Sequence, residues 1–105
     1  MTKVETMMNV AIQSEKPFCR GNTMVQHRDG VATVYLHGNK ICEVGEDWMK
    51  LFDGGWQSNT TKSRLNAILA QFGLENERVF AKNFEWRVQM RDGTSIPFFS
   101  GMRLA

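Results

Sequence analysis

Five consecutive residues in the middle of the chain combine hydroxyl groups and positive charge in a way that could bind an anion. They follow the flexible pair Gly54-Gly55 and start a stretch with helical periodicity. The amino end of a helix has free backbone N–H groups and partial positive charge, which favour acidic neighbours. This first turn instead carries two cations and no acid. We therefore predict a phosphate or carboxylate receptor formed by Thr60, Thr61, Lys62, Ser63 and Arg64.

The alternative is that both cations lie in solvent over their neighbours. A cationic first turn costs a few tenths of a kcal/mol to ~1 kcal/mol, and a bound anion would reverse the sign of that cost. We therefore expect Lys62→Ala with Arg64→Ala to weaken anion binding while preserving or slightly raising thermal stability. A large fall in melting temperature would show that the pair is structural.

A second basic pattern lies near the end of the chain, where Arg87, Gln89 and Arg91 alternate with apolar residues. Arg78 and Lys82 come shortly before it. Basic residues on the exposed face of a sheet can follow a phosphate backbone, and an exposed tryptophan can stack on a base. For Trp56, however, we expect a place in the core, with the arginines as a solubilising face.

The sequence shows no pattern typical of an enzyme or of a metal site. His27 and His37 fall on neighbouring expected strands, and no serine or cysteine lies in a recognisable nucleophile motif. Cys19 and Cys42 are expected to be reduced thiols, although a single disulfide stays open. We predict a non-enzymatic protein with no catalytic residues, no metal and no cofactor.

Length and composition are those of one small domain. The chain has 105 residues, of which 42% are hydrophobic and 23% charged, and a formal charge of +2. Residues 1–55 contain six basic and seven acidic side chains, whereas residues 56–105 contain seven basic and four acidic ones. Neither a membrane span nor a signal peptide is expected, which favours the cytoplasm.

The clearest expected helix covers residues 61–72. Its start has Thr60 or Thr61 as the N-cap, and Gly73 is expected to end it in the left-handed conformation. Apolar residues recur at helical spacing and form one buried stripe. The stripe consists of Leu65, Ile68, Leu69 and Phe72.

Strands are expected on both sides of this helix. Residues 23–28, 31–36 and 40–44 predict a meander with turns at Asp29-Gly30 and Gly38-Asn39. Residues 46–53 predict a short helix or a loop plugged by Trp48.

Residues 79–99 predict a strand pair that turns at Asp92-Gly93, with Pro97 on an edge strand and a packed C-terminus after it. The apolar face of the first strand of this pair is expected to be buried. It consists of Phe84, Trp86, Val88 and Met90.

The fold expected from these elements is α+β, in the order β-β-β-α-β-β, with one helix covering a small antiparallel sheet. Residues 21–105 would form this single domain. Residues 1–20 keep no clean period before Pro17, so a disordered or weakly docked arm is favoured over a short strand or a helix that docks on a partner. Unpaired edge strands would permit a homodimer.

Two segments resemble a family of small proteins encoded by tailed bacteriophages. They are Val34-Tyr35-Leu36-His37-Gly38-Asn39-Lys40-Ile41 and the run from Gly55-Trp56-Gln57 through Thr60-Thr61-Lys62-Ser63-Arg64-Leu65-Asn66-Ala67-Ile68-Leu69. The resemblance covers roughly residues 22–104, including the terminal Pro97-Phe98-Phe99-Ser100-Gly101-Met102. It implies a phage protein that works in the cytoplasm of a bacterial host, and it implies no catalytic or binding residue.

The function expected from these observations is that of a small phage accessory protein. It would bind nucleic acid or a phosphate-bearing ligand through the Thr60–Arg64 helix start together with Arg87 and Arg91. The alternative is a protein–protein module that inhibits a host defence or transcription protein, with Met7, Met8 or Trp48 as exposed anchors.

Overall fold

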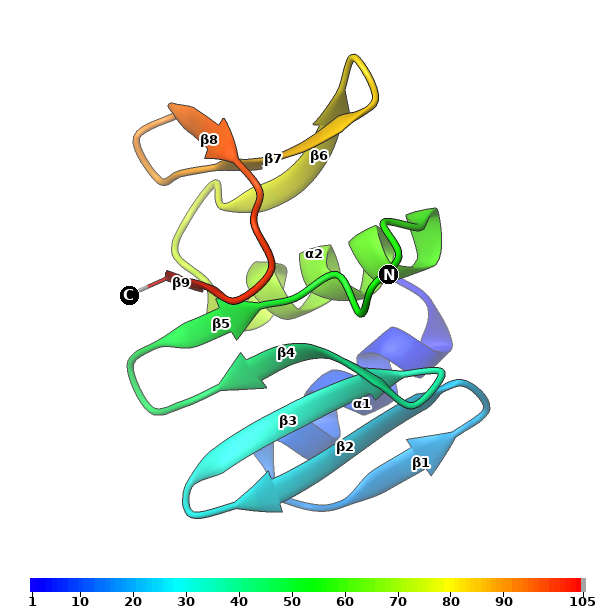
Figure 1. Cartoon of the computed structure of the whole chain (residues 1–105). Helices are drawn as coiled ribbons and strands as arrows, with labels where there is room; N and C mark the ends of the chain where they lie inside the picture. The colour runs from blue at the N-terminus through cyan, green and yellow to red at the C-terminus, as the bar shows by residue number, and fades with distance from the viewer. Residues whose placement is uncertain (105) are drawn as a thin grey trace.

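The computed structural model describes residues 1–104 and contains two helices and nine strands. The elements follow one another from the N-terminus to the C-terminus as drawn in Figure 1. Their bounds are α1 Lys3–Gln13, β1 Phe18–Arg20, β2 Thr23–Arg28, β3 Val31–Leu36, β4 Asn39–Val44, β5 Met49–Leu51, α2 Asn59–Phe72, β6 Arg78–Lys82, β7 Glu85–Gln89, β8 Ser95–Pro97 and β9 Met102–Leu104.

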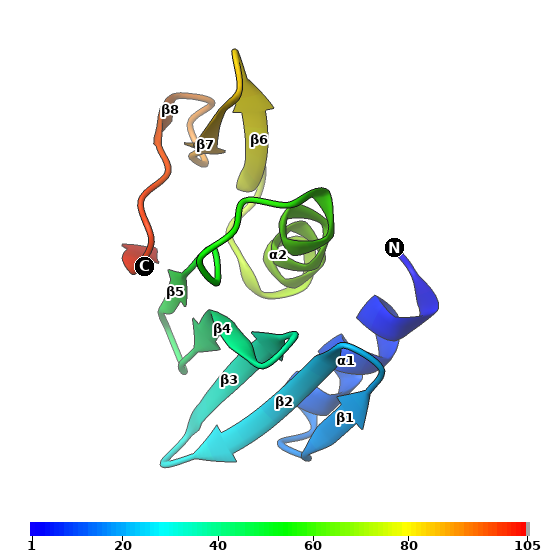
Figure 2. The ribbon, with the colours of Figure 1, turned by 45° about the vertical axis from the view of Figure 1, so that its right-hand side comes forward.

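The strands form two antiparallel sheets, and α2 lies between them (Figures 1 and 2). The larger sheet has the order β1-β2-β3-β4-β5-β9, and the smaller one has the order β6-β7-β8. Helix α1 lies against α2 and against β1 and β2 of the larger sheet. The α+β class is confirmed, but the expected single small sheet with one helix is corrected to two sheets and two helices.

Helix α1 replaces the arm expected over residues 1–20. Thr2 and Glu5 form a capping box, in which the Thr2 hydroxyl accepts from the Glu5 N–H and the Glu5 carboxylate accepts from the Thr2 N–H. Met8 and Ile12 are buried in the core. The apolar period is hard to see in the sequence because Val10 and other apolar residues of α1 face solvent.

The predicted meander is confirmed, since β2 and β3 have the expected bounds and β4 begins one residue early. Asp29 and Gly30 both have positive φ, as a two-residue turn of type I′ requires. The second turn uses His37 and Gly38, one residue before the predicted pair. Val25 and Cys42 flank Val34 in the register of the sheet, and all three are buried.

Strands β1 and β6 were not predicted. Neither were β5 and β9. The segment expected as a short helix or loop instead contains β5, which pairs with β4 and with β9 at the end of the described chain. Each of the two strands has only three residues, too few for a periodic pattern. Met102 and Leu104 are buried, so the expectation of a packed C-terminus is confirmed.

The smaller sheet buries Val88 and Trp86, as the alternation predicts, and the Trp86 ring meets Phe98 edge to face at 5.2 Å. Strand β8 contains Pro97 and lies at an edge, which confirms that prediction. The expected burial of Phe84 is wrong, because this residue lies in the β6–β7 turn with φ +64° and its side chain is fully exposed.

The apolar stripe of α2 is confirmed by the burial of Leu65, Ile68 and Leu69. The helix starts earlier than predicted, with Ser58 as its N-cap. Gly73 follows the helix in an extended conformation, with φ −80° and ψ 178°, and not in the predicted left-handed one.

Candidate nucleic-acid interface

The start of α2 is positioned by a glycine turn and a serine cap. Gly54 and Gly55 have φ values of +68° and +87°, a region that glycine enters at no steric cost. The Ser58 hydroxyl then accepts from the Thr61 N–H at 3.1 Å. Thr61 is buried, and its hydroxyl lies 3.0 Å from the Ser58 hydroxyl, so the two side chains are hydrogen-bonded to each other.

Arg64 points into the protein and meets a carboxylate from α1. Its Nη1 donates to Oε2 of Glu5 at 2.8 Å, and its Nε donates to the Thr23 hydroxyl at 3.1 Å. The Ser63 hydroxyl donates to the same Glu5 oxygen at 2.6 Å. Glu5 therefore supplies the negative charge that the sequence led us to expect from a ligand. The sequence clue was the Thr2-x-x-Glu5 pattern of a capping box.

The protonation of Glu5 is governed by two opposing influences. Burial raises its pKa, since a charged carboxylate is disfavoured away from water. Hydrogen bonds from Ser63, from the Thr2 backbone and from Arg64 lower it, and the net pKa lies below the usual range. The carboxylate is therefore held in its charged form beside Arg64.

Two of the five predicted receptor residues stay at the surface without a recorded side-chain hydrogen bond. Thr60 is exposed in the first turn of α2, and Lys62 is half-buried. No ion pair of Lys62 occurs within residues 1–104. The helix start therefore offers one hydroxyl and one cation to a ligand, and not the full set of five residues.

The outward face of the smaller sheet carries most of the second basic pattern. The Arg78 guanidinium lies over the Phe80 ring at 5.1 Å, and Phe80 is opposite Arg87 in the register. Arg87 donates from Nε and Nη2 to the hydroxyl and carbonyl oxygens of Ser95, both at 3.0 Å. These contacts hold the Arg87 side chain along the sheet.

Arg91 is separate from this face. It is exposed beyond the end of β7, beside a shallow depression that is also lined by Asp92 and Glu77. At the opposite end of the β6–β7 pair, Lys82 is exposed and lies opposite Glu85 in the register. The structure thus brings Arg78, Lys82 and Arg87 onto one sheet and leaves Arg91 outside.

Two strongly exposed aromatic rings lie in the loop before α2 and in the β6–β7 turn. Trp56 is 78% exposed, which corrects its expected place in the core, and Phe84 is fully exposed. In Figure 1 the β6–β7 turn and the start of α2 both lie on the right-hand side, with the turn above the helix. Sequence reasoning missed both rings as surface groups. The clue was that each follows turn-forming residues, Gly54-Gly55 for Trp56 and Asn83 for Phe84.

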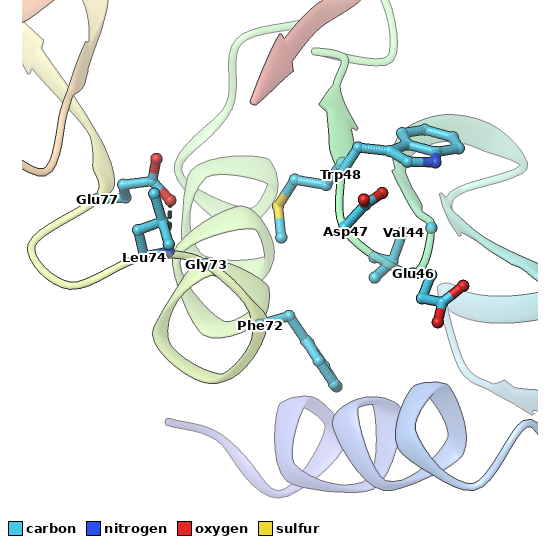
Figure 3. Close-up of a pocket in the computed structure, with 10 residues that line it drawn as sticks. Val44, Glu46, Asp47, Trp48, Phe72, Gly73, Leu74 and Glu77 are labelled. Carbon is cyan, nitrogen blue, oxygen red and sulfur yellow. Dashed lines mark hydrogen bonds between the residues drawn. The ribbon is translucent and has the colours of Figure 1, made fainter. Parts of the chain in front are cut away.

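The opposite end of α2 is acidic. A pocket of about 280 Å³ lies between the end of the helix and the β4–β5 turn, with Glu46, Asp47 and Glu77 among its lining residues and no lysine or arginine. Glu77 accepts from the Leu74 N–H at 2.6 Å and lies across the pocket from Glu46 and Asp47 (Figure 3). These charges disfavour a phosphate at this end.

The cysteines form no disulfide within residues 1–104, and His27 contacts the backbone near the end of α1. Both cysteines are free thiols, Cys19 exposed and Cys42 buried, and burial raises the pKa of the Cys42 thiol far above its usual range. Nε2 of His27 lies 3.1 Å from the Ala11 carbonyl oxygen and 2.9 Å from that of Lys16. His27 thus ties β2 to the end of α1.

Comparison with known proteins identifies a family. The family model described as Kyanoviridae Gp96 protein matches residues 1–105, and the chain therefore belongs to this bacteriophage protein family. Neither a curated protein nor a solved structure matches the chain. Within residues 1–104 no helix has the length and apolar character needed to cross a membrane.

Proposed function

From this phage family membership and the surface at the start of α2, we propose a non-enzymatic accessory protein that binds single-stranded nucleic acid in the cytoplasm of the bacterial host. The observation that supports the proposal most directly is the exposure of two rings, Trp56 in the loop before α2 and Phe84 in the β6–β7 turn. Free bases stack on exposed aromatic rings in a way that tolerates many sequences, at ~1–3 kcal/mol per base.

Cations suited to phosphate lie close to these rings along the chain. Lys62 is in the first turn of α2, and Lys82 ends β6 just before the turn that carries Phe84. Arg78 and Arg87 extend the positive charge along the outward face of the smaller sheet. Because each neutralised phosphate releases counterions, binding through these groups must weaken steeply as salt rises. A duplex would hide its bases from the rings, so the proposal specifies a single strand.

The test is fluorescence anisotropy with a labelled 15-nucleotide oligothymidine at ~50 and ~200 mM salt. We expect the wild-type protein to lose affinity steeply between these conditions. Lys62→Ala with Lys82→Ala should weaken binding at both and lower the slope of log affinity against log salt by about 1 for each cation removed. Trp56→Leu with Phe84→Leu should weaken binding and leave the slope nearly unchanged, since no charge is lost.

Arg28→Ala is the matched control. Arg28 is strongly exposed and lies 3.7 Å from Asp29 in the β2–β3 turn, at the end of the larger sheet away from the start of α2 (Figure 1). Its removal lowers the net charge by one, half the change made by the Lys62/Lys82 variant, and the affinity and the salt slope should stay as in the wild type. Equal losses for Arg28→Ala and for the Lys62/Lys82 variant would contradict the proposed interface.

The alternative, a module that inhibits a host protein, rests on α1. Val10 and Met7 of this helix are exposed, which gives it a small apolar face. Met8 cannot serve as the anchor that the sequence suggested, because it is fully buried. Capture of one host protein that is insensitive to salt and is abolished by Val10→Asp would favour this alternative over nucleic acid.

A further inference from the structure

A second pocket lies at the start of α2, beside the exposed Trp56. It has a volume of about 380 Å³, within the usual range for small-molecule sites. Leu36 and Ile41 of the larger sheet are buried to 5% and 1% exposure and form an apolar floor. The other lining residues come from the β3–β4 turn, the loop after β5 and the start of α2. They are His37, Asn39, Asp53, Gly54, Trp56, Ser58, Thr60 and Thr61.

Glycine at position 54 sets the shape of this pocket. A Cβ atom at Gly54 would lie 3.3 Å from Cγ2 of Ile41 and 3.3 Å from Cβ of Asn39, and φ at this position is +68°. Glycine therefore lets the loop cross close to β4 without strain at this position. The chain then turns, and Trp56 comes to line the pocket with its ring 78% exposed. A planar ring beside an apolar floor suits a flat, partly apolar ligand.

The polar groups of the lining define which flat ligand would fit. One oxygen of the Asp53 carboxylate accepts from the Gly55 N–H at 2.8 Å, and the other accepts no hydrogen bond from residues 1–104. A carboxylate oxygen can only accept, so it can receive an N–H or O–H group of a ligand in the pocket. No lysine or arginine lines the pocket to compete for it.

We propose that this pocket receives one nucleobase that carries an exocyclic amino group, stacked against Trp56 and donating to Asp53. Adenine, cytosine and guanine have such a group, whereas thymine and uracil have only a ring N–H flanked by two carbonyl oxygens, which repel a carboxylate. The inference rests on the proposed function for the presence of nucleic acid, and it adds a base preference to a surface that otherwise binds without regard to sequence. Asn39 and Thr60 offer further hydrogen bonds at the rim.

Two matched pairs of nucleosides test the proposal through tryptophan fluorescence. Cytidine and uridine differ at position 4 of the base, and adenosine and inosine differ at position 6, with an amino group in the first member of each pair. We expect cytidine and adenosine to quench the fluorescence at about tenfold lower concentration than uridine and inosine, the ratio for one hydrogen bond to a charged acceptor. The quenching should disappear in Trp56→Leu and persist in Trp48→Phe.

Two variants assign the preference to this pocket. Asp53→Asn keeps the size of the side chain but lets it donate as well as accept, so the preference for amino-bearing bases should fall to less than about threefold. Thr60→Tyr places a ring in the pocket mouth and should abolish nucleoside quenching. Asp53→Asn should leave the affinity for oligothymidine within about twofold of the wild type, because thymine has no amino group to donate to Asp53.

The outcomes separate this inference from the proposed function. Equal quenching by both members of each pair, or quenching that Thr60→Tyr leaves intact, would overturn the base pocket. Oligothymidine binding with the expected salt slope would still stand in that case. Conversely, amino-dependent quenching by nucleosides in a protein that binds no oligonucleotide would support the pocket and refute the proposed interface.

Discussion

The two ends of helix α2 show how one element can present opposite surfaces. At the amino end lie the exposed Trp56 ring, Lys62 and a pocket with a single carboxylate, Asp53. At the carboxyl end the pocket is lined by three carboxylates, those of Glu46, Asp47 and Glu77. An anionic ligand that approaches the molecule is therefore attracted to one end and repelled from the other.

The two ends of α2 also differ in the side chains that form hydrogen bonds and ion pairs there. The amino end receives Glu5 from α1, whose carboxylate meets Arg64 and Ser63. The carboxyl end has no basic residue in its last turn, and Glu77 instead caps the Leu74 N–H just beyond it. A helix end that looks poorly compensated in the sequence can thus be completed by a distant segment. The remaining unpaired cation, Lys62, is the one open to a ligand.

The largest expected effect of any change at either end is that of Arg64→Ala. It would leave Glu5 as a buried carboxylate without its ionic partner, and we expect unfolding free energy to fall by about 3–5 kcal/mol. Urea denaturation would measure the change. This replaces the sequence-based expectation that removing Lys62 and Arg64 preserves stability. Lys62→Ala alone is the control and should change stability by less than about 0.5 kcal/mol. Equal effects of the two variants would mean that the buried pair contributes nothing.

Gly73→Ala tests the carboxyl end. A Cβ atom there would lie 2.7 Å from the Leu69 carbonyl oxygen and 2.9 Å from Oε1 of Glu77, so the backbone or the Glu77 cap must shift. We expect a loss of about 1–3 kcal/mol, as for other overpacked sites, measured by thermal or urea unfolding.

The matched change at the amino end is Ser58→Ala, which removes the N-cap acceptor and should cost about 1 kcal/mol. A Gly73→Ala protein as stable as the wild type would show that this end of the helix relaxes freely. The contrast between a crowded carboxyl end and an open amino end would then be lost.

A smaller effect is expected from acid. The pKa of Glu5 is lowered in the folded protein, so its charged form contributes stability above the unfolded pKa of about 4.3. As pH falls below that value the unfolded chain binds the proton first, and the contribution is lost as pH falls through the lower folded pKa. Unfolding free energy should therefore decrease more steeply below pH ~4.3 in the wild type than in Glu5→Gln. Parallel pH profiles would contradict the assigned role of Glu5.

The smallest effect is expected from charge reversal at the carboxyl end. Glu46→Lys with Asp47→Lys adds positive charge far from the proposed interface, where salt at ~150 mM screens charges beyond ~8 Å. The slope of log affinity for oligothymidine against log salt should stay unchanged, and affinity should rise less than about threefold. A slope steeper by 1 or more would show that the strand also reaches the carboxyl end.

Sequence reasoning was most successful where a local rule acted alone. Alternation and turn chemistry defined β2 and β3, and three of the four residues predicted for the apolar stripe of α2 are buried. It failed for α1 because the exposed Val10 lies among apolar residues and obscures the helical period. It failed for β5 and β9 because a strand of three residues is stabilised by pairing with other strands and has no pattern of its own. Two predicted ligand contacts, Arg64 and Ser63, were misread because their partner Glu5 lies far away in the sequence.

By itself the sequence determined the α+β class, the meander, the main helix and the presence of cations near positions 62 and 82. Only the tertiary structure decided which cations are used internally and which rings are exposed. The physical reason is that burial and ion pairing depend on segments that meet in space, such as α1 against α2. Periodicity and turn preference, in contrast, depend on residues that are close in the sequence. Arg64 was expected at the surface and is buried, whereas Trp56 was expected in the core and is exposed.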